Sequence, residues 1–256
     1  MKILVTVKQV PDTSGKVAVN PDGTLDRASM QTIINPDDLN AVEAALALKD
    51  QLGCKVVAFT MGPPPAEGML RELMAMGVDE GVLITAREFG GSDTYATSQI
   101  IAAGIDTYGV DEDDVILAGR QAIDGDTAQV GPQVAEDLDI PQVTYAWEVW
   151  PTEDGQHVRV KKELEEGFEI LEMACPCAVT VTKPDYEPRF PTIKSKMAAN
   201  KAKIPVLSAA DCGLDVERSG LKGSPTKVKK SFTPPRKEGG LKIKEETPEE
   251  SKEAVR

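Results

Sequence analysis

The feature that most constrains the fold of this chain is the alternation of short apolar runs with helical patterns over residues 1–150. The runs at Ile3–Val7, Val56–Met61, Gly81–Thr85 and Val115–Ala118 are almost continuously apolar, as expected for strands covered on both faces. A β-α-β-α order of this kind predicts an α/β fold with a doubly wound, mostly parallel sheet. Ligands of such sheets bind outside the carboxyl ends of the strands, so each candidate ligand segment should follow a strand.

Helical patterns fill the intervals between these runs. Asn35-Pro36 begins the first, because Asn35 is an N-cap candidate and a proline is preset for the first helical position. Glycines act as stop signals after the first two helices. The predicted helices are Leu39–Leu52, Ala66–Met76, Asp93–Tyr108 and Thr127–Leu138.

The pattern changes after the fourth helix. Val158–Lys162 and Phe168–Glu172 flank a Glu-Glu-Gly turn and predict a β-hairpin over residues 157–173. One further strand is predicted at Ala178–Thr182. We assign these elements to the same unit as the preceding strands and helices, so the predicted α/β domain spans residues 1–183.

The last quarter of the chain differs in charge and periodicity. The whole sequence has 42 acidic and 29 basic side chains, a net charge of -13, which excludes a bulk nucleic-acid binder. Arg189–Arg256 nevertheless holds 16 Lys and Arg against 9 Asp and Glu. Periodicity is lost beyond Pro184, and such a segment cannot by itself bury enough apolar surface to offset its ordering entropy. Residues 184–256 are therefore predicted to form a docking loop and a basic arm that binds a partner.

The start of the chain and its rarer residues exclude several classes of protein. Met1–Lys8 is strand-like at once and leaves no room for a secretion signal, and no apolar run approaches the roughly 20 residues that cross a bilayer. The four cysteines lack the spacing of a disulfide framework or a zinc site. The single histidine, His157, is predicted in a polar turn, far from the strand ends that a catalytic triad would need. We expect a cytoplasmic protein with no membrane segment and no metal site.

One segment carries the strongest signal for a ligand. Gly119–Gly131 directly follows an apolar run, which makes it a strand-to-helix loop. Its glycines allow close backbone approach, Arg120 offers a fork of donors to phosphate, and the amides near Asp126 and Thr127 would begin a helix whose positive end favours an anion. The segment matches neither common phosphate-loop pattern. A capped helix with an Asx turn at Asp124 explains the same residues equally well.

Three further segments lie at strand ends or helix starts. Met61-Gly62-Pro63 and Asn35-Pro36 could line an adenine or ribose pocket, although each is more simply explained as structural punctuation. Phe89–Thr97 follows the run at Gly81–Thr85 and enters a helix. Its glycines and hydroxyls would suit a second nucleotide, and the alternative is a Ser or Asp cap after a flexible turn.

Together these segments resemble the β subunit of electron transfer flavoprotein, and the resemblance covers essentially the whole chain. The matching segments are Val5–Val10, Asn35-Pro36, Met61-Gly62-Pro63, Ala75–Asp79 and Gly119–Asp126. The hairpin matches the family signature at Val160, Lys162, Glu165, Glu166, Glu169, Leu171 and Pro176. Ala178 departs from the family, where a larger aliphatic residue is usual.

The resemblance implies a Rossmann-like domain of the adenine-nucleotide hydrolase type, paired with an obligate α subunit that carries its own FAD. Respiratory members hold AMP in the β subunit, whereas electron-bifurcating members from anaerobes place the ADP half of a second FAD there and bind NADH beside it. Gly90–Thr97 and Val7–Thr13 resemble the bifurcating group, which favours FAD with NAD(H) over AMP alone. The implied NADH-binding residues are Gly90, Gly91, Ser92, Asp93 and Thr94. The implied cofactor-binding residues are Thr6, Asn35, Pro36, Met61, Gly62, Thr94, Thr97, Gly119, Arg120, Gln121, Ala122, Asp124, Gly125, Asp126, Thr127, Ala128, Gln129 and Val130.

The mechanism that the resemblance implies has NADH at Gly90–Thr94 delivering a hydride to a flavin held by Gly119–Val130. One electron then passes to ferredoxin or flavodoxin, and the other passes through the α-subunit FAD to an acyl-CoA dehydrogenase. The flavin would carry the chemistry while the protein supplies position and electrostatics. Arg120 is the candidate for stabilising an anionic reduced flavin.

The resemblance also assigns Lys183–Arg189 to the loop that docks on the dehydrogenase. Family members carry an exposed leucine there, whereas this sequence has Pro184, Asp185, Tyr186, Glu187 and Pro188. The anchor is therefore shifted or replaced, and Tyr186 is the candidate because an amphipathic side chain suits an interface.

Two other functions remain open. One is a plain electron carrier whose β subunit uses AMP as a structural ligand. The other is a stand-alone adenine-nucleotide binder of the stress-protein type, which would leave the hairpin signature and the basic tail unexplained.

Overall fold

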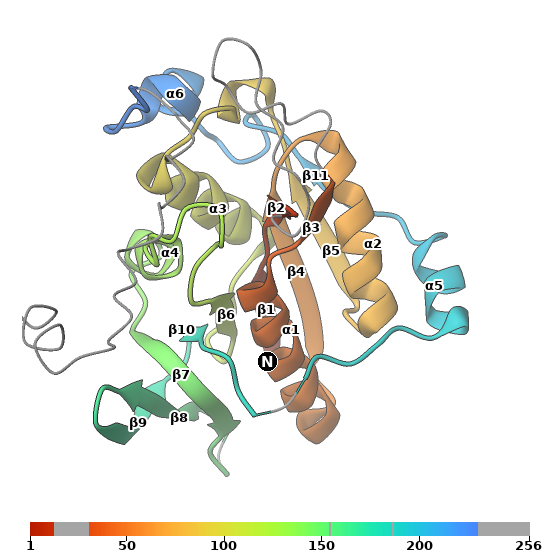
Figure 1. Cartoon of the computed structure of the whole chain (residues 1–256), viewed down its shortest axis with the longest axis vertical. Helices are drawn as coiled ribbons and strands as arrows, with labels where there is room; N and C mark the ends of the chain where they lie inside the picture. The colour runs from red at the N-terminus through yellow and green to blue at the C-terminus, as the bar shows by residue number, and fades with distance from the viewer. Residues whose placement is uncertain (13–30, 154, 186, 230–256) are drawn as a thin grey trace, which may run out of the picture.

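The computed structural model describes residues 1–12, 31–153, 155–185 and 187–229. Its main sheet has nine strands in the order β11-β5-β4-β1-β6-β10-β7-β8-β9 (Figure 1). The strands are β1 (Lys2–Thr6), β4 (Lys55–Met61), β5 (Glu80–Ile84), β6 (Val115–Gly119), β7 (Gln142–Pro151), β8 (His157–Leu164), β9 (Gly167–Ala174), β10 (Cys177–Val181) and β11 (Val206–Leu207). All neighbouring pairs from β11 to β7 are parallel, and β7, β8 and β9 are antiparallel. The predicted mostly parallel sheet is confirmed.

Helices cover both faces of this sheet. The helices α1 (Pro36–Leu52) and α2 (Glu67–Met76) lie on one face, and α3 (Thr94–Tyr108) and α4 (Val130–Asp137) lie on the other. Two further helices, α5 (Ile193–Ala199) and α6 (Gly220–Gly223), follow the last long strand. Short 3-10 turns span Pro64–Ala66, Arg87–Phe89 and Val216–Arg218. Over the described ranges, no helix is both long and apolar enough to cross a membrane.

Two apolar cores hold the layers together, one on each face of the sheet. Leu46 of α1 and Leu70 of α2 pack on one face, and Ile100 of α3 packs with Phe59 of β4 on the other. Each of these side chains is at most 1% exposed, and full burial of a side chain of this size contributes about 1.5–3 kcal/mol. The continuous apolar runs are therefore explained by burial from both sides.

The order of the strands places a switch point beside β1. The chain runs from β1 outward through β4 and β5, and it then returns to the other side of β1 as β6. The loops that follow β1 and β6 therefore diverge from neighbouring strand ends. In open α/β sheets this is where ligands bind. A small separate ribbon of β2 (Gln9–Pro11) and β3 (Thr32–Ile34) continues from the end of β1.

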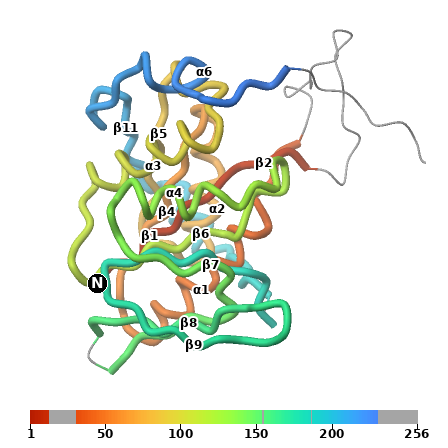
Figure 2. Tube along the Cα trace, turned by 90° about the vertical axis from the view of Figure 1, so that its left-hand side faces the viewer, coloured from red at the N-terminus to blue at the C-terminus, as the bar shows by residue number. Residues whose placement is uncertain are grey.

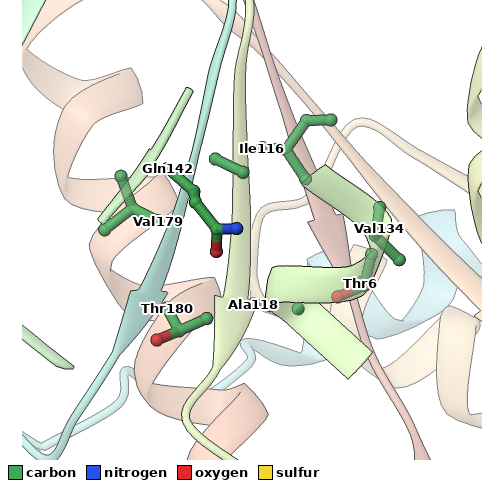
Figure 3. A pocket seen from close by; sticks show the side chains of 9 residues that line it. Thr6, Ile116, Ala118, Val134, Gln142, Val179 and Thr180 are labelled. Atoms are coloured by element: carbon green, nitrogen blue, oxygen red, sulfur yellow. The ribbon is translucent and has the colours of Figure 1, made fainter. Parts of the chain in front are cut away.

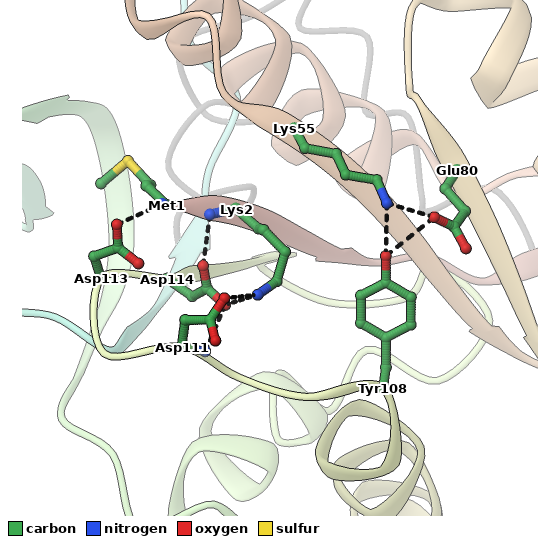
Figure 4. Close-up of polar contacts among 8 residues, drawn as sticks. All are labelled: Met1, Lys2, Lys55, Glu80, Tyr108, Asp111, Asp113 and Asp114. Carbon is green, nitrogen blue, oxygen red and sulfur yellow. Dashed lines mark hydrogen bonds and ion pairs between the residues drawn. The ribbon is translucent and has the colours of Figure 1, made fainter.

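The amino-terminal ends of the central strands, opposite the ligand side, are held by polar contacts (Figure 4). The Met1 amino group pairs with Asp113, and Lys2 pairs with Asp111 and Asp114. The backbone N–H groups of Lys2 and Asp111 donate to the fully buried Asp114 carboxylate at 2.5 and 2.8 Å. These contacts satisfy a buried charge and fix the start of β1, so they serve the fold and not the ligand edge.

A second cluster of polar side chains at the same end of the strands joins β4, β5 and α3. The Lys55 ammonium group donates to Glu80 at 2.6 Å and to the Tyr108 hydroxyl at 2.9 Å. The Tyr108 hydroxyl in turn donates to Glu80 at 3.1 Å, and its ring packs edge-on against Phe59. The end of α3 is thereby fixed to the strands that it covers.

The predicted hairpin is confirmed as β8 and β9, at the end of the sheet opposite β11 and α6 (Figure 2). Its outer face carries an edge-on contact between Trp147 and Phe168, with the Lys161 ammonium group 4.3 Å from the Phe168 ring centroid. The expectation that His157 lies in a polar turn is wrong. His157 is half-buried and begins β8, because the turn ends one residue earlier.

The expectation that regular structure ends at Pro184 is also wrong. The short strand β11 pairs with β5, and the amides of Leu83 in β5 and of Thr85 just after it donate to the carbonyls of Pro205 and Leu207 at 2.9 Å. The later segments are too short to show a period, and they are ordered by packing on the sheet that precedes them in the chain. Whether residues 184–256 also wrap a partner subunit stays a prediction, and residues 230–256 lie outside the described ranges.

Candidate functional site

The Gly119–Gly131 loop begins at the switch point and rests on the start of α1. Gly119 is buried, and a Cβ atom there would lie 2.6 Å from the Asp38 backbone nitrogen. Glycine is therefore required because the loop passes directly over the helix backbone. The next residue, Arg120, is tied by its backbone N–H to the Val181 carbonyl at 2.9 Å.

Asn35 holds the same loop through two side-chain hydrogen bonds. Its side-chain amide donates to the Gln121 carbonyl at 2.8 Å and accepts from the Ile123 N–H at 3.1 Å. Asn35 stands at the N-cap position of α1, and Pro36 occupies the first helical position as predicted. The side chain of Asn35 makes no capping bond, because it is fully buried and committed to the loop. A residue predicted as a helix signal therefore acts as a loop support.

Two residues that the sequence analysis did not assign to the site, Lys8 and Asp38, complete this support. The Asp38 carboxylate is buried and accepts from the backbone N–H of Lys8 at 2.7 Å and from that of Gly119. Burial raises the pKa of Asp38 to about 7, although its hydrogen bonds act in the opposite direction. The Lys8 ammonium group donates to Asp124 at 2.7 and 2.9 Å. The loops after β1 and β6 are thereby joined.

Asp37 faces Arg120 from the first turn of α1. One carboxylate oxygen of Asp37 lies 3.6 Å from the Arg120 Nε, and this buried oxygen has no hydrogen-bond partner among the described residues. Burial raises the pKa of Asp37, and the charge of Arg120 partly offsets the shift. The Gln121 N–H also donates to Asp37. An acceptor without a donor and a half-exposed guanidinium group therefore lie side by side at the ligand edge.

The helix after the loop starts later than predicted. We expected it to begin at Thr127, whereas α4 begins at Val130. The backbone φ angles of Asp126 and Ala128 are 49° and 52°, a left-handed conformation that cannot continue into a right-handed helix. The helix dipole therefore acts near Gln129 and not near Asp126.

This later start leaves a row of free donors. Within the part of the chain that the structure describes, the backbone N–H groups of Thr127, Ala128, Gln129 and Val130 donate to no acceptor. Such consecutive donors at a helix start form a concave site for an anion. Thr127 and Gln129 are exposed, as are Asp124, Gly125 and Asp126, so a ligand has access. Gln121 closes the loop internally through a 2.9 Å bond from its side-chain amide to Asp126.

The second predicted loop meets the first one. The Thr94 hydroxyl donates to the Gln129 side-chain oxygen at 3.0 Å, which joins Gly90–Thr94 to the start of α4. Gly90 and Gly91 are both exposed, while the Ser92 hydroxyl turns back to the Phe89 carbonyl at 2.7 Å. Thr97 continues the first turn of α3, where its N–H donates to the Asp93 carbonyl. The two predicted nucleotide segments therefore share one edge of the molecule.

Asp93 is occupied by structural contacts. Its carboxylate accepts from the Ala96 N–H at 3.0 Å and from the Thr226 hydroxyl at 2.7 Å, and its own N–H donates to the Ser224 hydroxyl at 2.8 Å. Burial raises its pKa, but the hydrogen bonds from Ala96 and Thr226 outweigh that effect and lower the pKa overall. The expected Asp cap is confirmed, and a segment after α6 covers part of the loop. Its contribution to NADH binding stays a prediction.

Other predicted residues lie at the same strand ends but deeper. Thr6 is buried and lines a small cavity of about 10 Å³ with Ala118, Gly131 and Thr180, under α4 (Figure 3). That volume suits a single water molecule. Met61 ends β4, and the Gly62 N–H donates to the Ile84 carbonyl at 3.1 Å.

A larger hollow lies elsewhere. It has a volume of about 550 Å³ and is bounded by the outer side of α3, the end of α4 and residues 213–219. Asp106, Asp137, Asp215 and Arg218 line it, and none of the predicted site residues does. The ligand edge at the switch point is therefore defined by its donors and not by this hollow.

The predicted docking segment is only partly exposed. Pro184 is buried, Pro188 is half-buried, and Asp185 and Glu187 are exposed. Tyr186, the candidate anchor, lies outside the described residues. Directly after this segment, Phe190 is 91% exposed and Ile193 is 82% exposed.

The missed residues had weak signals in the sequence. Asp37 and Asp38 lie in the first turn of α1, where acids favour the helix dipole, and this arrangement also occurs in many helices without a ligand. Lys8 follows β1 in the same way that Gly119 ends β6. A search for polar residues after β1 would have found it.

An adenine dinucleotide or mononucleotide fits this arrangement. The free amides of Thr127–Val130 suit a phosphate or pyrophosphate. The space beside Gly125 is open, since a Cβ atom there would meet no other atom within 4 Å. The buried Asp37 oxygen that faces Arg120 lacks a hydrogen-bond donor, which a ribose hydroxyl that reached it would supply. These features can hold and orient a nucleotide cofactor whose redox chemistry is its own.

Comparison with known proteins identifies the family of this chain. Residues 22–212 match the electron transfer flavoprotein domain. The chain is 56% identical over 248 residues to the acryloyl-CoA reductase electron transfer subunit gamma of Anaerotignum propionicum, covering 95% of this chain and 92% of that protein. It is 49% identical over 252 residues to the electron transfer flavoprotein subunit beta of Megasphaera elsdenii, with coverage of 96% and 92%. It is 48% identical over 245 residues to the caffeyl-CoA reductase-Etf complex subunit CarD of Acetobacterium woodii, with coverage of 95% and 92%.

Proposed function

This chain belongs to the electron transfer flavoprotein family, as a β subunit, and from that premise we propose that it binds FAD and NADH and bifurcates electrons within a heterodimer. Electron transfer and an α-subunit partner come with the family. The cofactor, the NADH site and the electron acceptors are our proposal.

The observation that carries the proposal is the hydrogen bond between Thr94 and Gln129. It joins the Gly90–Thr94 loop to the free amides of Thr127–Val130 at one edge of the sheet. A flavin nucleotide at the amides and a dinucleotide at the glycine loop would then be neighbours, as hydride transfer between them requires.

The residues of this chain would bind and orient the cofactor. The amides of Thr127–Val130 would hold its pyrophosphate, and Asn35 and Asp38 would keep the loop in place from below. Arg120 would supply a fixed positive charge, since its backbone is tied to Val181 and its side chain faces Asp37. When bound, the flavin would accept a hydride from NADH and release electrons one at a time.

The proposed acceptors are a ferredoxin or flavodoxin and, through the FAD of the α subunit, an acyl-CoA dehydrogenase. Support for the acyl-CoA acceptor comes from two relatives that are named as subunits of acryloyl-CoA and caffeyl-CoA reductase systems. The second candidate is an electron carrier in which AMP binds to the same backbone amides as a structural ligand. The free donors of Thr127–Val130 suit its phosphate as well.

Flavin content and NADH reduction separate the two candidates. The heterodimer is purified with its α subunit, its FAD and AMP are extracted and counted, and NADH is added without oxygen. Two FAD per heterodimer and rapid loss of flavin absorbance are expected. One FAD with extractable AMP would rule out bifurcation by this protein.

Replacement of Arg120 tests the role of its charge. Arg120→Ala is expected to weaken FAD retention and to lower the reduction potential of the β-subunit flavin, because an anionic reduced form loses its counter-charge. The measurements are FAD affinity of the apo-heterodimer and a spectroscopic redox titration. If both stay at the wild-type values, Arg120 does not contact the flavin.

We place the dehydrogenase contact on a docking face made of Phe190, Ile193 and Met197. These side chains are 91%, 82% and 60% exposed, and they follow the segment in which family members carry an exposed leucine. Pro184 is buried and cannot serve. We propose Ile193 as a second candidate anchor, as a branched aliphatic side chain at the start of α5, while Tyr186 stays an untested prediction.

A further inference from the structure

The docking face lies largely on helix α5, and the burial of α5 side chains does not account for the stability of this helix. Helix α5 has seven residues, and Ala199 is the one buried residue among them. Isolated helices of this length are not stable in water, and burial of one alanine adds little. Other interactions must hold α5 in place.

The first of these interactions lies before the helix, at Arg189. Its guanidinium group donates from Nε to both Glu43 oxygens at 2.9 and 3.0 Å, and from Nη2 to Glu43 at 2.8 Å and to Asp50 at 2.8 Å. The Arg189 backbone N–H also donates to Glu43, at 2.9 Å. Glu43 lies in α1 and is only 8% exposed. The chain just before Phe190 is therefore fixed to the interior of the domain.

The second interaction lies after the helix, at Arg71 of α2. Its Nη1 donates to the carbonyls of Ala199 and Ala202 at 2.7 and 3.0 Å. These carbonyls lie at and just beyond the end of α5, where backbone oxygens lack helical partners and favour a cation. Glu67 orients Arg71 through bonds of 2.6 and 3.1 Å.

The start of the helix is closed as well. Thr192 and Ser195 form a reciprocal capping box. The helix is thus held by polar contacts at both ends, while Ile193 and Met197 point away from the domain.

We propose that Glu43–Arg189 and Glu67–Arg71 are positioning pairs that hold α5 in its docking conformation before the electron-transfer partner arrives. The inference rests on the proposed docking function and adds how the face is kept ready. A preordered face spares the partner the entropy of ordering these side chains during binding. Stability alone is a weak reason for Glu43, because well-packed apolar residues often match or exceed a buried ion pair.

The charges around the face indicate the chemistry of the partner. Lys194 and Lys196 lie in α5 and Lys201 and Lys203 follow it, and none of these four pairs with a carboxylate of the described residues. An apolar pocket with an acidic rim is complementary to such a surface. A protein partner of this kind is what the positioning pairs would serve.

The experiment uses the heterodimer and the acryloyl-CoA reductase of Anaerotignum propionicum, whose electron transfer subunit is 56% identical to this chain. Electron transfer from heterodimer to reductase is measured over a range of reductase concentrations, and backbone hydrogen exchange over residues 189–202 is measured in the heterodimer alone. Glu43→Gln keeps the shape of the buried side chain but removes its charge. Asp50→Asn is the matched control, since it is the 61% exposed partner of the same arginine.

Glu43→Gln is expected to raise the KM for the reductase about tenfold, with kcat and flavin content unchanged and with faster exchange over 189–202. Arg71→Gln should act in the same direction, and it keeps the test possible if Glu43→Gln does not fold. Arg189→Lys should raise the KM and the exchange rate less than Arg189→Ala does, because the lysine keeps the positive charge. Asp50→Asn should change the KM less than about twofold.

Each contrary result has a separate meaning. Faster exchange in Glu43→Gln or Arg71→Gln with an unchanged KM would overturn the positioning role while leaving docking possible. Unchanged exchange in both variants would show that the pairs do not hold α5. An unchanged KM in Ile193→Ala would remove the docking function itself, and binding of the heterodimer to vesicles with anionic lipid would then assign the face to a membrane surface.

Discussion

At the scale of single residues, Asp38 couples the ligand loop to pH. Its carboxyl is buried at the start of α1 and supports both Lys8 and Gly119. Because its pKa rises from 3.8 to about 7 on folding, the folded chain binds this proton more tightly than the unfolded chain does. The free energy of unfolding therefore loses a contribution as the pH rises from about 4 to about 7.

Asp38→Asn should remove this loss. The difference in unfolding free energy between wild type and Asp38→Asn is expected to shift by up to about 4 kcal/mol across that range, in favour of the variant as pH rises. Urea denaturation at several pH values measures it. The exposed Asp106→Asn is the control, and parallel curves for wild type and Asp38→Asn would contradict the assignment.

Two glycines of the ligand loop offer a matched pair. At Gly119 a Cβ atom would lie 2.6 Å from the backbone of Asp38, whereas at Gly125 it would meet nothing within 4 Å. Gly119→Ala should destabilise the chain by about 1–3 kcal/mol because the loop must lift from α1. Gly125→Ala should change stability by less than about 0.5 kcal/mol. Thermal unfolding of both variants measures this, and equal melting temperatures would mean that the loop does not rest on α1.

At the scale of elements, the edge of β5 reports whether β11 is part of the sheet. The amides of Leu83 and Thr85 donate to carbonyls of the β11 segment. Their hydrogen exchange in the heterodimer should be as slow as that of the β5 amides that face β4. If residues beyond Pro184 formed only a detached arm, Leu83 and Thr85 would exchange quickly while the β4 side stayed protected.

Elements with a strong internal pattern were predicted well, and the others were not. The four apolar runs became β1, β4, β5 and β6 because burial on both faces leaves a continuous apolar signature. The start of α4 was missed because the left-handed φ angles of Asp126 and Ala128 leave no mark in composition. Strand β11 has two residues, too few for a period, and it forms only because β5 offers it an edge.

The candidate site shows the same division. The Gly119–Val130 loop and the Gly90–Thr94 loop were found because each follows a strand, and strand ends are readable from the sequence. The supporting roles of Asn35 and Asp38 do not follow from the sequence, since each contacts the Gly119–Val130 loop across more than 80 residues. Such contacts depend on the order of strands in the sheet, which local patterns do not contain.

At the scale of the whole molecule, the basic excess of the last quarter of the chain is not spread evenly along the predicted arm. Residues 189–229 hold 9 Lys and Arg against 3 Asp and Glu, so most of the basic excess lies in a part that packs on this chain's own sheet and helices. Residues 230–256 hold 7 basic and 6 acidic side chains, which is close to neutral. A purely electrostatic attachment of the last residues to a partner is therefore weak.

Two truncations separate the folding role of the tail from its assembly role. A chain ending at Pro188 loses α5 and β11, exposes the edge of β5, and should both unfold at a lower temperature and fail to assemble with the α subunit. A chain ending at Lys229 keeps every described element and should melt like the full chain. If residues 230–256 wrap the α subunit, its affinity for that subunit should fall at least about tenfold and change little with salt, because the segment is nearly neutral. Size-exclusion chromatography and titration with the α subunit measure both effects. Full assembly by the chain ending at Lys229 would show that residues 230–256 are not needed for the contact.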